Sequence, residues 1–384
     1  MRHQNTVFHG LLKFIPWSLF DQLVDKHEMD FGVRTLTTRT QFVAMLFGQL
    51  AGSISLRDLV TSLESHATRL YHLGAKAVHR SSLSDANRDR SYKFFDELFD
   101  AVLARTPIGL PRPMRQAVRL IDATGIRLQE LRSAWAQFSE GVFGAKLHVV
   151  YDLNDARPIF FVVTKANVND ITPAKTIKIE RGATYVFDLG YYDFGWWATL
   201  DAQGCRIVTR FKKNTPLDVV AENKVFEGSN ILSDRIGHLP ERLCYSRRNP
   251  FQDPVREICV RIESGKILRL LTNDLDATAQ EIADLYKSRW EIELFFRWIK
   301  QTLKIKHFFG TSENAVRIQI AVALIAFLLL RAAREAFGFT GDALAFLRLV
   351  RANLWHRRPL GHLWMPPDRG DQNLNQMLLE LAPC

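Results

Sequence analysis

Apolar and polar positions follow a helical period through the first part of the chain. In residues 1–105 the apolar residues recur at intervals of three and four, which places them on one face of successive α-helices. This pattern predicts helices over residues 17–26, 38–50, 56–63 and 92–103. We therefore expect residues 1–105 to form an all-helical N-terminal domain.

The pattern changes to short apolar runs after residues 106–116, where three prolines and one glycine mark a linker. These runs predict strands over residues 117–122, 145–153, 157–164, 184–188 and 206–211, and a helix over residues 194–200. Three strands, a connection, a strand, a helix, a strand and a late helix is the element order of a ribonuclease-H-like fold. The predicted fold class is therefore α/β, with a ribonuclease-H-like catalytic core whose first part spans residues 114–211.

The return of a helical period divides the later part of the chain. Residues 212–276 are strand-rich, with strands predicted over residues 242–245, 255–262 and 266–271, and we interpret them as a β-rich insertion. Residues 277–335 would complete the core with its last helix, and residues 336–384 would form a helical C-terminal region. The longest apolar run, residues 320–330, is shorter than the roughly 20 residues that span a bilayer. We expect a buried helix there and no membrane segment.

One segment of the late helical region combines an apolar face with a single charged stripe. It contains no Pro or Gly, and at about 100° per residue it places Tyr286, Arg289, Glu293 and Lys300 on the same side. Glu291 lies roughly 160° around the helix from Glu293 by the same rotation. Only one carboxylate therefore shares a face with the cations, and their positive charge should keep it ionised. An ordinary amphipathic helix with a solvated charged face remains the alternative.

Two aspartates upstream each follow an apolar strand. Asp122 ends the first predicted strand and Asp188 ends the fourth, so each should project from a strand end near the middle of the sheet. Together with Glu293 they can hold two divalent cations, one to activate the attacking oxygen and one to stabilise the leaving oxygen of a phosphoryl displacement. Because all these ligands are hard oxygens, we expect Mg²⁺, with Mn²⁺ as a substitute. A turn or cap role for either aspartate is the competing interpretation.

A net charge of +10 at pH 7 favours a polyanionic partner such as nucleic acid. Arg210, Lys212 and Lys213, at the end of the fifth predicted strand, are candidates to contact the phosphates of a DNA backbone. Residues 79–90 combine hydroxyls, an amide and arginines at a helix start, and they either contact DNA or form an ordinary capped helix. Four aromatic residues either stack an unpaired base or pack in the core, and we expect core packing for at least two: Tyr191, Tyr192, Trp196 and Trp197.

Two further features bear on where the protein works. The four cysteines show no spacing typical of a metal site, which indicates reduced thiols in a cytosolic protein. The chain opens with an amphipathic segment, without the uninterrupted apolar core of a signal peptide. Both observations favour a cytoplasmic location.

The spacing Tyr286-x2-Arg289-x3-Glu293-x6-Lys300 resembles the YREK signature of the DDE transposases of bacterial insertion sequences, in the insertion sequence four family. Asp122-Ala-Thr-Gly and Asp188-Leu-Gly-Tyr are similar to the first and second acid motifs of that family. Gly144-Ala-Lys-Leu-His and Thr209-Arg-Phe-Lys-Lys-Asn are similar to further family segments and occur in the right order. The resemblance covers residues 117–310, and Leu189, where a polar or basic residue is frequent, does not alter the acid beside it.

This resemblance implies a DNA transposase that binds the terminal inverted repeats of its insertion sequence and its target DNA. It implies metal-dependent strand cleavage, hairpin formation and strand transfer, with Asp122, Asp188 and Glu293 as metal ligands. Phosphate contacts would come from Tyr286, Arg289 and Lys300. It also implies a DNA-binding N-terminal domain, a β-rich insertion at residues 212–276, a homodimer on paired ends and a location at the bacterial nucleoid. A structure-specific metal nuclease and a non-catalytic DNA-binding relative are the alternatives.

Overall fold

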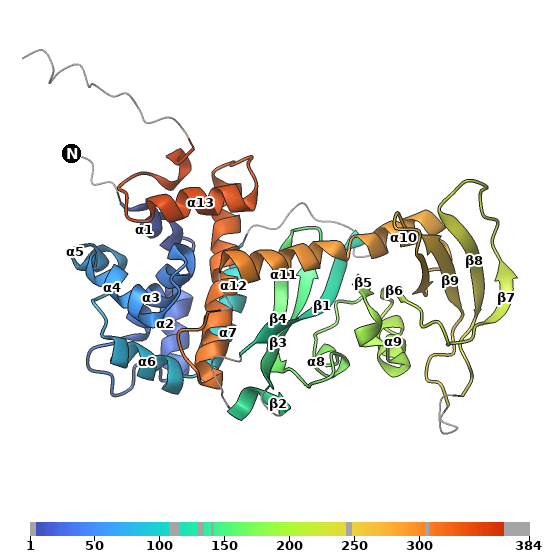
Figure 1. Ribbon diagram of the computed structural model, residues 1–384, viewed down its shortest axis with the longest axis horizontal. Helices are drawn as coiled ribbons and strands as arrows, with labels where there is room; N and C mark the ends of the chain where they lie inside the picture. The colour runs from blue at the N-terminus through green and yellow to red at the C-terminus, as the bar shows by residue number, and fades with distance from the viewer. Residues whose placement is uncertain are drawn as a thin grey trace, which may run out of the picture.

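Three parts lie along the long axis of the molecule (Figure 1): helices at one end, the core of the sheet in the middle and the insertion strands at the other end. The computed structural model describes residues 5–106, 116–128, 134–139, 142–242, 248–303 and 307–364. Three predicted segments lie wholly or largely outside these residues: the linker at 106–116, the strand at 242–245 and the last part of the C-terminal region, 365–384.

The N-terminal part is helical, as predicted. Its helices are α1 (Val7–Leu12), α2 (Trp17–Lys26), α3 (Thr38–Ala51), α4 (Leu56–Glu64), α5 (Ala67–Leu70), α6 (Arg80–Asp89) and α7 (Tyr92–Arg105), with a 3₁₀ turn η1 (Tyr71–Leu73). The helix starts follow from capping side chains: Thr37 accepts from the third residue of α3, and Ser55 does the same for α4. Each cap satisfies a backbone N–H that has no partner within its helix.

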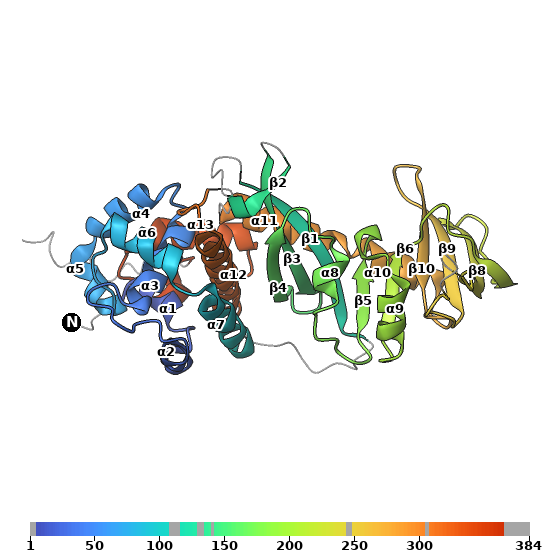
Figure 2. The ribbon, with the colours of Figure 1, turned by 90° about the horizontal axis from the view of Figure 1, so that it is seen from below.

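A long helix near the C-terminus, α12 (Glu313–Ala336), lies between these helices and the sheet. It packs against α3, α6 and α7, and α7 lies beside it in both ribbon views (Figure 2). Helix α13 (Ala343–Asn353) and the turn η7 (Leu360–His362) pack nearby. By length and composition α12 would qualify as a membrane span, but 83% of its most apolar window is buried inside the protein. The prediction of a buried helix is therefore confirmed.

A fragment of residues 1–105 should fold poorly without α12. The fragment would leave the apolar faces of α3 and α7 open to water where α12 covers them in the whole chain. We expect it to bind a hydrophobic dye and to lose its helical circular dichroism over a broad temperature range. The whole chain should unfold cooperatively in the same measurement. A sharp melting transition and no dye binding by the fragment would contradict this expectation.

The core of the sheet has the predicted ribonuclease-H-like topology. Strands β3 (Val142–Asp152) and β4 (Arg157–Lys165) pair antiparallel, and β3 pairs antiparallel with β1 (Val118–Arg127). Strands β5 (Thr184–Phe187) and β6 (Arg206–Arg210) follow parallel to β1, and helix α9 (Phe194–Asp201) connects them. The short elements of this part are η4 (Ala134–Ala136), β2 (Gln137–Ser139), α8 (Ile171–Ala174) and η5 (Leu189–Tyr191).

The insertion continues the same sheet. Strand β10 (Ile267–Thr272) pairs antiparallel with β6, and β9 (Val255–Arg261), β8 (Ile231–His238) and β7 (Asp218–Glu222) follow in that order. The described strands thus form one ten-stranded sheet. The sequence predicts β9 and β10 but misses β7 and β8. All of β7 is exposed, so it carries no alternation of buried and exposed positions.

Strand β8 escapes prediction because it buries a charge. Asp234 is buried within β8, and its carboxylate accepts two hydrogen bonds from the buried guanidinium of Arg256 on β9, at 2.6 and 2.7 Å. Such a bidentate pair satisfies both groups. In the sequence, an aspartate among polar residues indicates a loop. In the structure, the ion pair with Arg256 on β9 allows Asp234 to lie within the sheet.

Candidate active site

Asp122 and Asp188 lie side by side on neighbouring strands. Ile121 of β1 pairs in parallel register with Phe187 of β5, so the next residues, Asp122 and Asp188, are adjacent on strands about 4.8 Å apart. The prediction that Asp188 directly follows a strand is confirmed. The matching prediction for Asp122 is wrong, because β1 continues to Arg127 through its pairing with β3 and leaves Asp122 within the strand.

The two carboxylates are fixed by backbone N–H groups. Asp122 Oδ1 accepts a hydrogen bond from the N–H of Ala123 at 2.8 Å, and Asp188 Oδ1 accepts one from Gly190 at 2.8 Å. A β-carbon at Gly190 would lie 3.0 Å from Asp188 Oδ1 and 3.0 Å from an oxygen of Asp170. Glycine at this position therefore leaves room for two carboxylates to approach each other.

The charged stripe lies on two helices rather than the single helix that the sequence predicts. Helix α10 (Ala279–Lys287) has Ser288 as its C-cap, and α11 (Trp290–Thr302) begins after its N-cap, Arg289. At this junction the N–H of Arg289 bonds the carbonyl of Tyr286, three residues back, which is the spacing of a 3₁₀ turn. The two helices nevertheless run as one line across the sheet (Figure 1).

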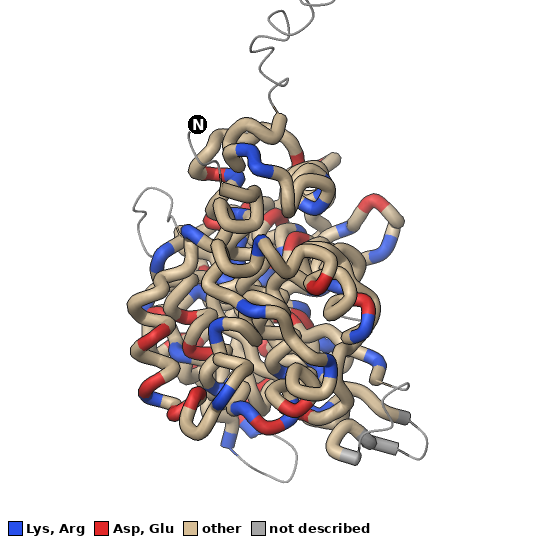
Figure 3. Tube along the Cα trace, turned by 90° about the vertical axis from the view of Figure 1, so that its left-hand side faces the viewer, with Lys and Arg blue, Asp and Glu red and all other residues tan. Residues whose placement is uncertain are grey.

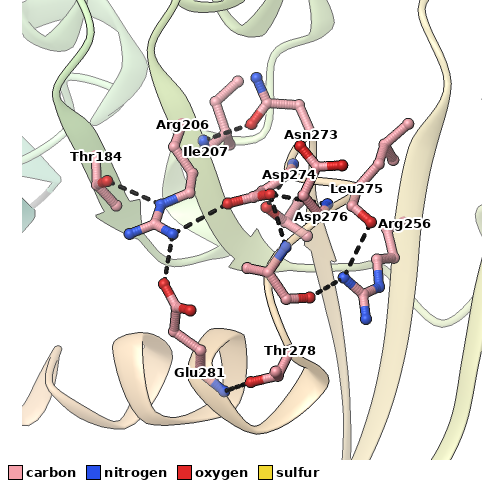
Figure 4. Close-up of polar contacts among 12 residues, drawn as sticks. Thr184, Arg206, Ile207, Arg256, Asn273, Asp274, Leu275, Asp276, Thr278 and Glu281 are labelled. Atoms are coloured by element: carbon pink, nitrogen blue, oxygen red, sulfur yellow. Dashed lines mark hydrogen bonds and ion pairs between the residues drawn. The ribbon is translucent and has the colours of Figure 1, made fainter. Parts of the chain in front are cut away.

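A polar network holds the start of α10 against the sheet (Figure 4). Arg206 of β6 donates to Thr184 Oγ1 at 2.9 Å, to Asp274 Oδ2 at 3.0 Å and to Glu281 Oε1 at 2.7 Å. Thr278 caps α10 by accepting from the N–H of Glu281. Because Arg206 joins β5, β6 and α10, it fixes the helix that leads into the charged stripe.

Arg289 joins the sheet to the second helix. Its Nη1 donates to Asp122 Oδ2 at 3.0 Å, and its Nη2 donates to Glu293 Oε1. The guanidinium also lies 5.9 Å from the ring centre of Tyr286. Glu291 is exposed and lines a different cavity with Phe295. The structure therefore agrees with the predicted helical phase, in which Glu293 and not Glu291 shares a side with Arg289.

The electrostatics of these groups show that they form one cluster. Burial raises the pKa of the Asp122 carboxyl to about 6. The hydrogen bond from the Ala123 N–H and the charge of Arg289 lower this pKa, but by less. The charges of Asp188 and Glu293 raise the pKa of Asp122 further, as expected for carboxylates held close together. A cation between them would oppose this repulsion.

Tyr286 and Arg210 complete this cluster. Burial raises the pKa of the Tyr286 hydroxyl, and the nearby charges of Arg289 and Arg210 oppose that rise while Asp188 adds to it. Tyr286 is 9% exposed, so its hydroxyl stays protonated and keeps a donor near the charged groups. The charge of Arg210, at the end of β6, thus acts on the same hydroxyl as those of Arg289 and Asp188.

The remaining predicted basic residues lie on α11 and in the loop after β6. Lys300 is half-buried in α11, two helical turns beyond Glu293. Lys212 and Lys213 are exposed in the loop after β6, and their carbonyl oxygens each accept a hydrogen bond from Arg269 at 2.8 Å. Arg269 therefore fixes the loop, which leaves both lysine side chains at the surface.

The aromatic residues after Asp188 are mostly core. Tyr191, Trp196 and Trp197 are buried, as expected for at least two of the four. Tyr192 is half-buried, and the ammonium of Lys212 lies 4.2 Å from its ring centre. Tyr192 is therefore the member of this group that lies closest to the surface loop.

Two polar residues of the 79–90 segment serve the fold. Asn87 is buried and accepts a hydrogen bond from Gln41, and Arg90 donates to Gln41 and to the carbonyl of Leu36. Arg88 pairs with neighbouring acids of its own helix. Helix α6 is present, but no side chain caps its start, because its N-cap residue His79 accepts no hydrogen bond from the helix. Contact of this segment with DNA stays a prediction.

One acid near the site was missed from the sequence. Asp170 approaches Asp188 across Gly190, and Lys146 Nζ donates to its carboxylate at 2.8 Å. His148 lies beside it with a pKa lowered to about 4, mainly by burial, so its ring is neutral at pH 7. Lys146 and His148 lie in the Gly144 segment noted above. Asp170 sits in a loop, where no periodic pattern marks it.

The three carboxylates suit a divalent cation as ligands. Without a cation, Asp122 and Glu293 form ion pairs with Arg289. Asp122, Asp188 and Glu293 offer only hard carboxylate oxygens, which Mg²⁺ and similar ions prefer. Within the part of the chain that the structure describes, no three His, Cys, Asp or Glu residues stand close enough to form a ready-made metal site. Arg289 supplies the positive charge that Asp122 and Glu293 share, so a cation would compete with it for both.

Residues 113–329 match the family model described as the transposase DDE domain, which is more than half of the chain. The chain belongs to the DDE transposase family. A second model, a domain of unknown function (DUF4372), matches residues 3–76, which hold the first helices of this transposase.

Relatives with transposase names cover most of the chain. A protein of Sinorhizobium fredii (strain NBRC 101917 / NGR234), y4zB, is 41% identical over 287 residues, which is 74% of this chain and 80% of the relative. A protein of Geobacillus stearothermophilus, named for insertion sequence element IS5377, is 28% identical over 298 residues, or 75% and 76% of the two chains. The predicted relationship to transposases of insertion sequences is therefore confirmed.

A solved structure confirms the fold. The piggyBac transposase, in a synaptic complex with hairpin DNA, superposes with a TM-score of 0.50 at 11% identity, over 96% of this chain and 83% of that one. The chain is thus a DNA-cleaving and strand-transferring enzyme with a ribonuclease-H-like core. As a DDE transposase it acts on DNA and uses divalent metal ions.

Proposed function

We propose that this transposase excises its own insertion sequence by cut-and-paste transposition, through a hairpin at each element end. The observation that supports this most is the double contact of Arg289 with Asp122 of the sheet and Glu293 of α11. If these acids hold Mg²⁺, an arginine that contacts both of them would also lie within reach of the strand that they cut.

Asp122, Asp188 and Glu293 are the proposed metal ligands. Bound Mg²⁺ ions would activate the attacking oxygen and stabilise the leaving oxygen of the displacement. Arg289, once released from the two carboxylates, can grip a phosphate with two parallel hydrogen bonds. Tyr286 and Lys300 would hold neighbouring phosphates, since both lie along the same pair of helices.

Hairpin formation asks for more than hydrolysis. The freed 3′ hydroxyl must attack the opposite strand, so that strand must be bent and held near the acids. The proposed grip of Arg289 and Lys300 supplies this hold, and Arg210, Lys212 and Lys213 would contact the DNA backbone beside it. The solved piggyBac complex contains hairpin DNA, which is the same kind of product.

The proposed partners are the terminal inverted repeats of the element, on which two copies of the chain would pair the ends, and the target DNA. The helical part, residues 1–105, would recognise the repeats together with α12. The site of action would be the bacterial cytoplasm at the nucleoid. These assignments follow the family resemblance and the excess of basic residues.

Wild-type protein with Mg²⁺ should convert a labelled element-end duplex first to a nicked strand, then to a hairpin, and finally to a product joined to target DNA. A denaturing gel separates all three species, and chelation of the metal should stop the first step. Mn²⁺ should restore it. Nicked product without hairpin or joined product would support a structure-specific nuclease, and specific binding without any cleavage would support a non-catalytic relative.

A further inference from the structure

A basic cavity lies in the helical part, away from the acids. It has a volume of about 360 Å³ and is formed by α1, the start of α2, α3 and η1. Every ionisable residue that lines it is basic: His9, Lys13, Arg39 and His72. Figure 3 looks onto this end of the molecule and shows acidic and basic residues interspersed over it. The cavity therefore concentrates positive charge on a surface that is otherwise mixed.

Buried nitrogen atoms at this cavity lack partners. Arg39 Nε and His9 Nδ1 are both shielded from solvent, and neither has a hydrogen-bond partner among the described residues. Burial and the charges of Lys13 and His72 lower the pKa of His9, as expected where cations converge. Because a buried N–H donor without a partner is unfavourable, an anion that accepts from Arg39 would remove this cost.

Neighbouring residues hold Arg39 in place. Its guanidinium lies 4.0 Å from the ring centre of Trp17, and the Trp17 Nε1 is fixed by the carbonyl of Leu12 at 3.1 Å. On the other side, a β-carbon at Gly74 would lie 2.7 Å from Arg39 Nε, so only glycine admits this packing. Gly74 has a φ of +67°, which glycine adopts without strain. The arginine is therefore preorganised for a ligand.

The rim of the cavity suits a ligand that remains mostly outside. Lys13 is exposed at the end of α1, and Tyr71, 81% exposed, contacts the ring of His72 at 5.5 Å between centres. Tyrosine is among the side chains that contact the phosphates and sugars of duplex DNA, so Tyr71 could lie against the backbone next to a bound phosphate. A backbone phosphate could enter while the rest of a duplex stays at the surface.

We infer that this cavity binds a backbone phosphate of the transposon-end duplex, at a distance from the cleavage site. The inference rests on the proposed function, since it assumes that the helical part meets the element ends. It gives the region that matches the domain of unknown function a defined task, which is to anchor the DNA through Lys13 and Arg39.

Full-length Lys13→Gln/Arg39→Gln protein tests the inference against a matched control, Arg34→Gln/Arg57→Gln. The control removes the same charge from exposed residues of the same helical part that do not line the cavity. Affinity for a labelled end duplex is measured by fluorescence anisotropy at several salt concentrations. We expect the cavity variant to bind about ten- to a hundred-fold more weakly. Its dependence of log affinity on log salt should become shallower by about 0.9 per lost phosphate contact.

The control pair should lose less than about threefold by this measurement. Equal losses in the two variants, or no loss in the cavity variant, would overturn the inference. If wild type does not nick ends but the cavity variant still binds duplex more weakly than the control, the proposed function fails and the inference stands. If wild type nicks ends but the cavity and control variants lose equal DNA affinity, the proposed function stands and the inference fails.

Two further measurements keep the test decisive. Lys13 should be protected from acetylation when wild-type protein is saturated with end duplex, whereas exposed Lys93 on α7 should react as in free protein. This readout needs no variant to fold, and equal reactivity of Lys13 with and without DNA would overturn the inference. Calorimetry with inorganic phosphate covers the other source of the ligand. Phosphate binding that the cavity variant loses while it keeps its DNA affinity would mark a free-anion site instead.

Discussion

Replacing Asp122, Asp188 or Glu293 by Ala should each lower metal-dependent nicking of the element end by a thousandfold or more, on the order expected when residues act as one unit. The structure supports this expectation because Asp122 and Asp188 are neighbours in register, and Glu293 reaches Asp122 through Arg289. Single and double replacements should therefore be equally damaging. Rates of the first nick are measured on a denaturing gel at saturating DNA.

The matched control for this result is Glu291→Gln beside Glu293→Gln. Glu291 is exposed on the other side of α11, two positions away, so its replacement should keep most of the nicking activity. DNA affinity, measured separately, should stay within about threefold of wild type in all variants. A variant at Asp122, Asp188 or Glu293 that still nicks within tenfold of wild type would remove that residue from the proposed ligands.

Arg289→Ala and Lys300→Ala should slow hairpin formation about ten- to a hundred-fold more than they slow the first nick. Each charge-assisted phosphate contact is worth about 1.5–3 kcal/mol, which corresponds to that ratio if the contact matters only in the later step. Arg289→Lys should not rescue, because an ammonium lacks the planar fork that reaches two oxygens at once. A pre-nicked end substrate measures the later step directly.

The control for this second result is Lys287→Ala. Lys287 is two residues from Arg289. Its side chain is 78% exposed and forms an ion pair with surface Glu263. We expect both steps to keep their rates in this variant. If Arg289→Ala slows the nick and the hairpin equally, the arginine serves the two carboxylates alone and the proposed grip on the second strand is wrong.

Local pattern was enough to place most of these elements. Helix and strand periods follow from which side chains are buried, so they predict the N-terminal helices and the strand that leads to Asp188. The helical phase also separates Glu293 from Glu291, because rotation about a helix axis depends only on spacing.

Contacts between segments far apart in the sequence could not be predicted from these periods. Asp122 and Arg289 are 167 positions apart, and only the folded sheet brings them to 3.0 Å. The same holds for Asp170, which meets Asp188 across a loop, and for the Asp234–Arg256 pair that makes β8 a strand. The length of β1 beyond Asp122 likewise depends on its pairing with β3.

Strand β7 lies at the edge of the sheet, where its residues affect edge-to-edge aggregation of the protein. An edge strand offers unpaired backbone groups to any other chain, and charged, exposed residues such as Asp218 and Glu222 discourage such pairing. Loss of the four insertion strands would expose the backbone edge of β6. Ile207, Val208 and Thr209 are buried in this strand, and apolar residues pack around it. The shortened chain would then be prone to aggregate edge to edge beside β5, which leads to the proposed metal ligand Asp188. The insertion thus covers the edge of β6 and keeps it from pairing with another chain.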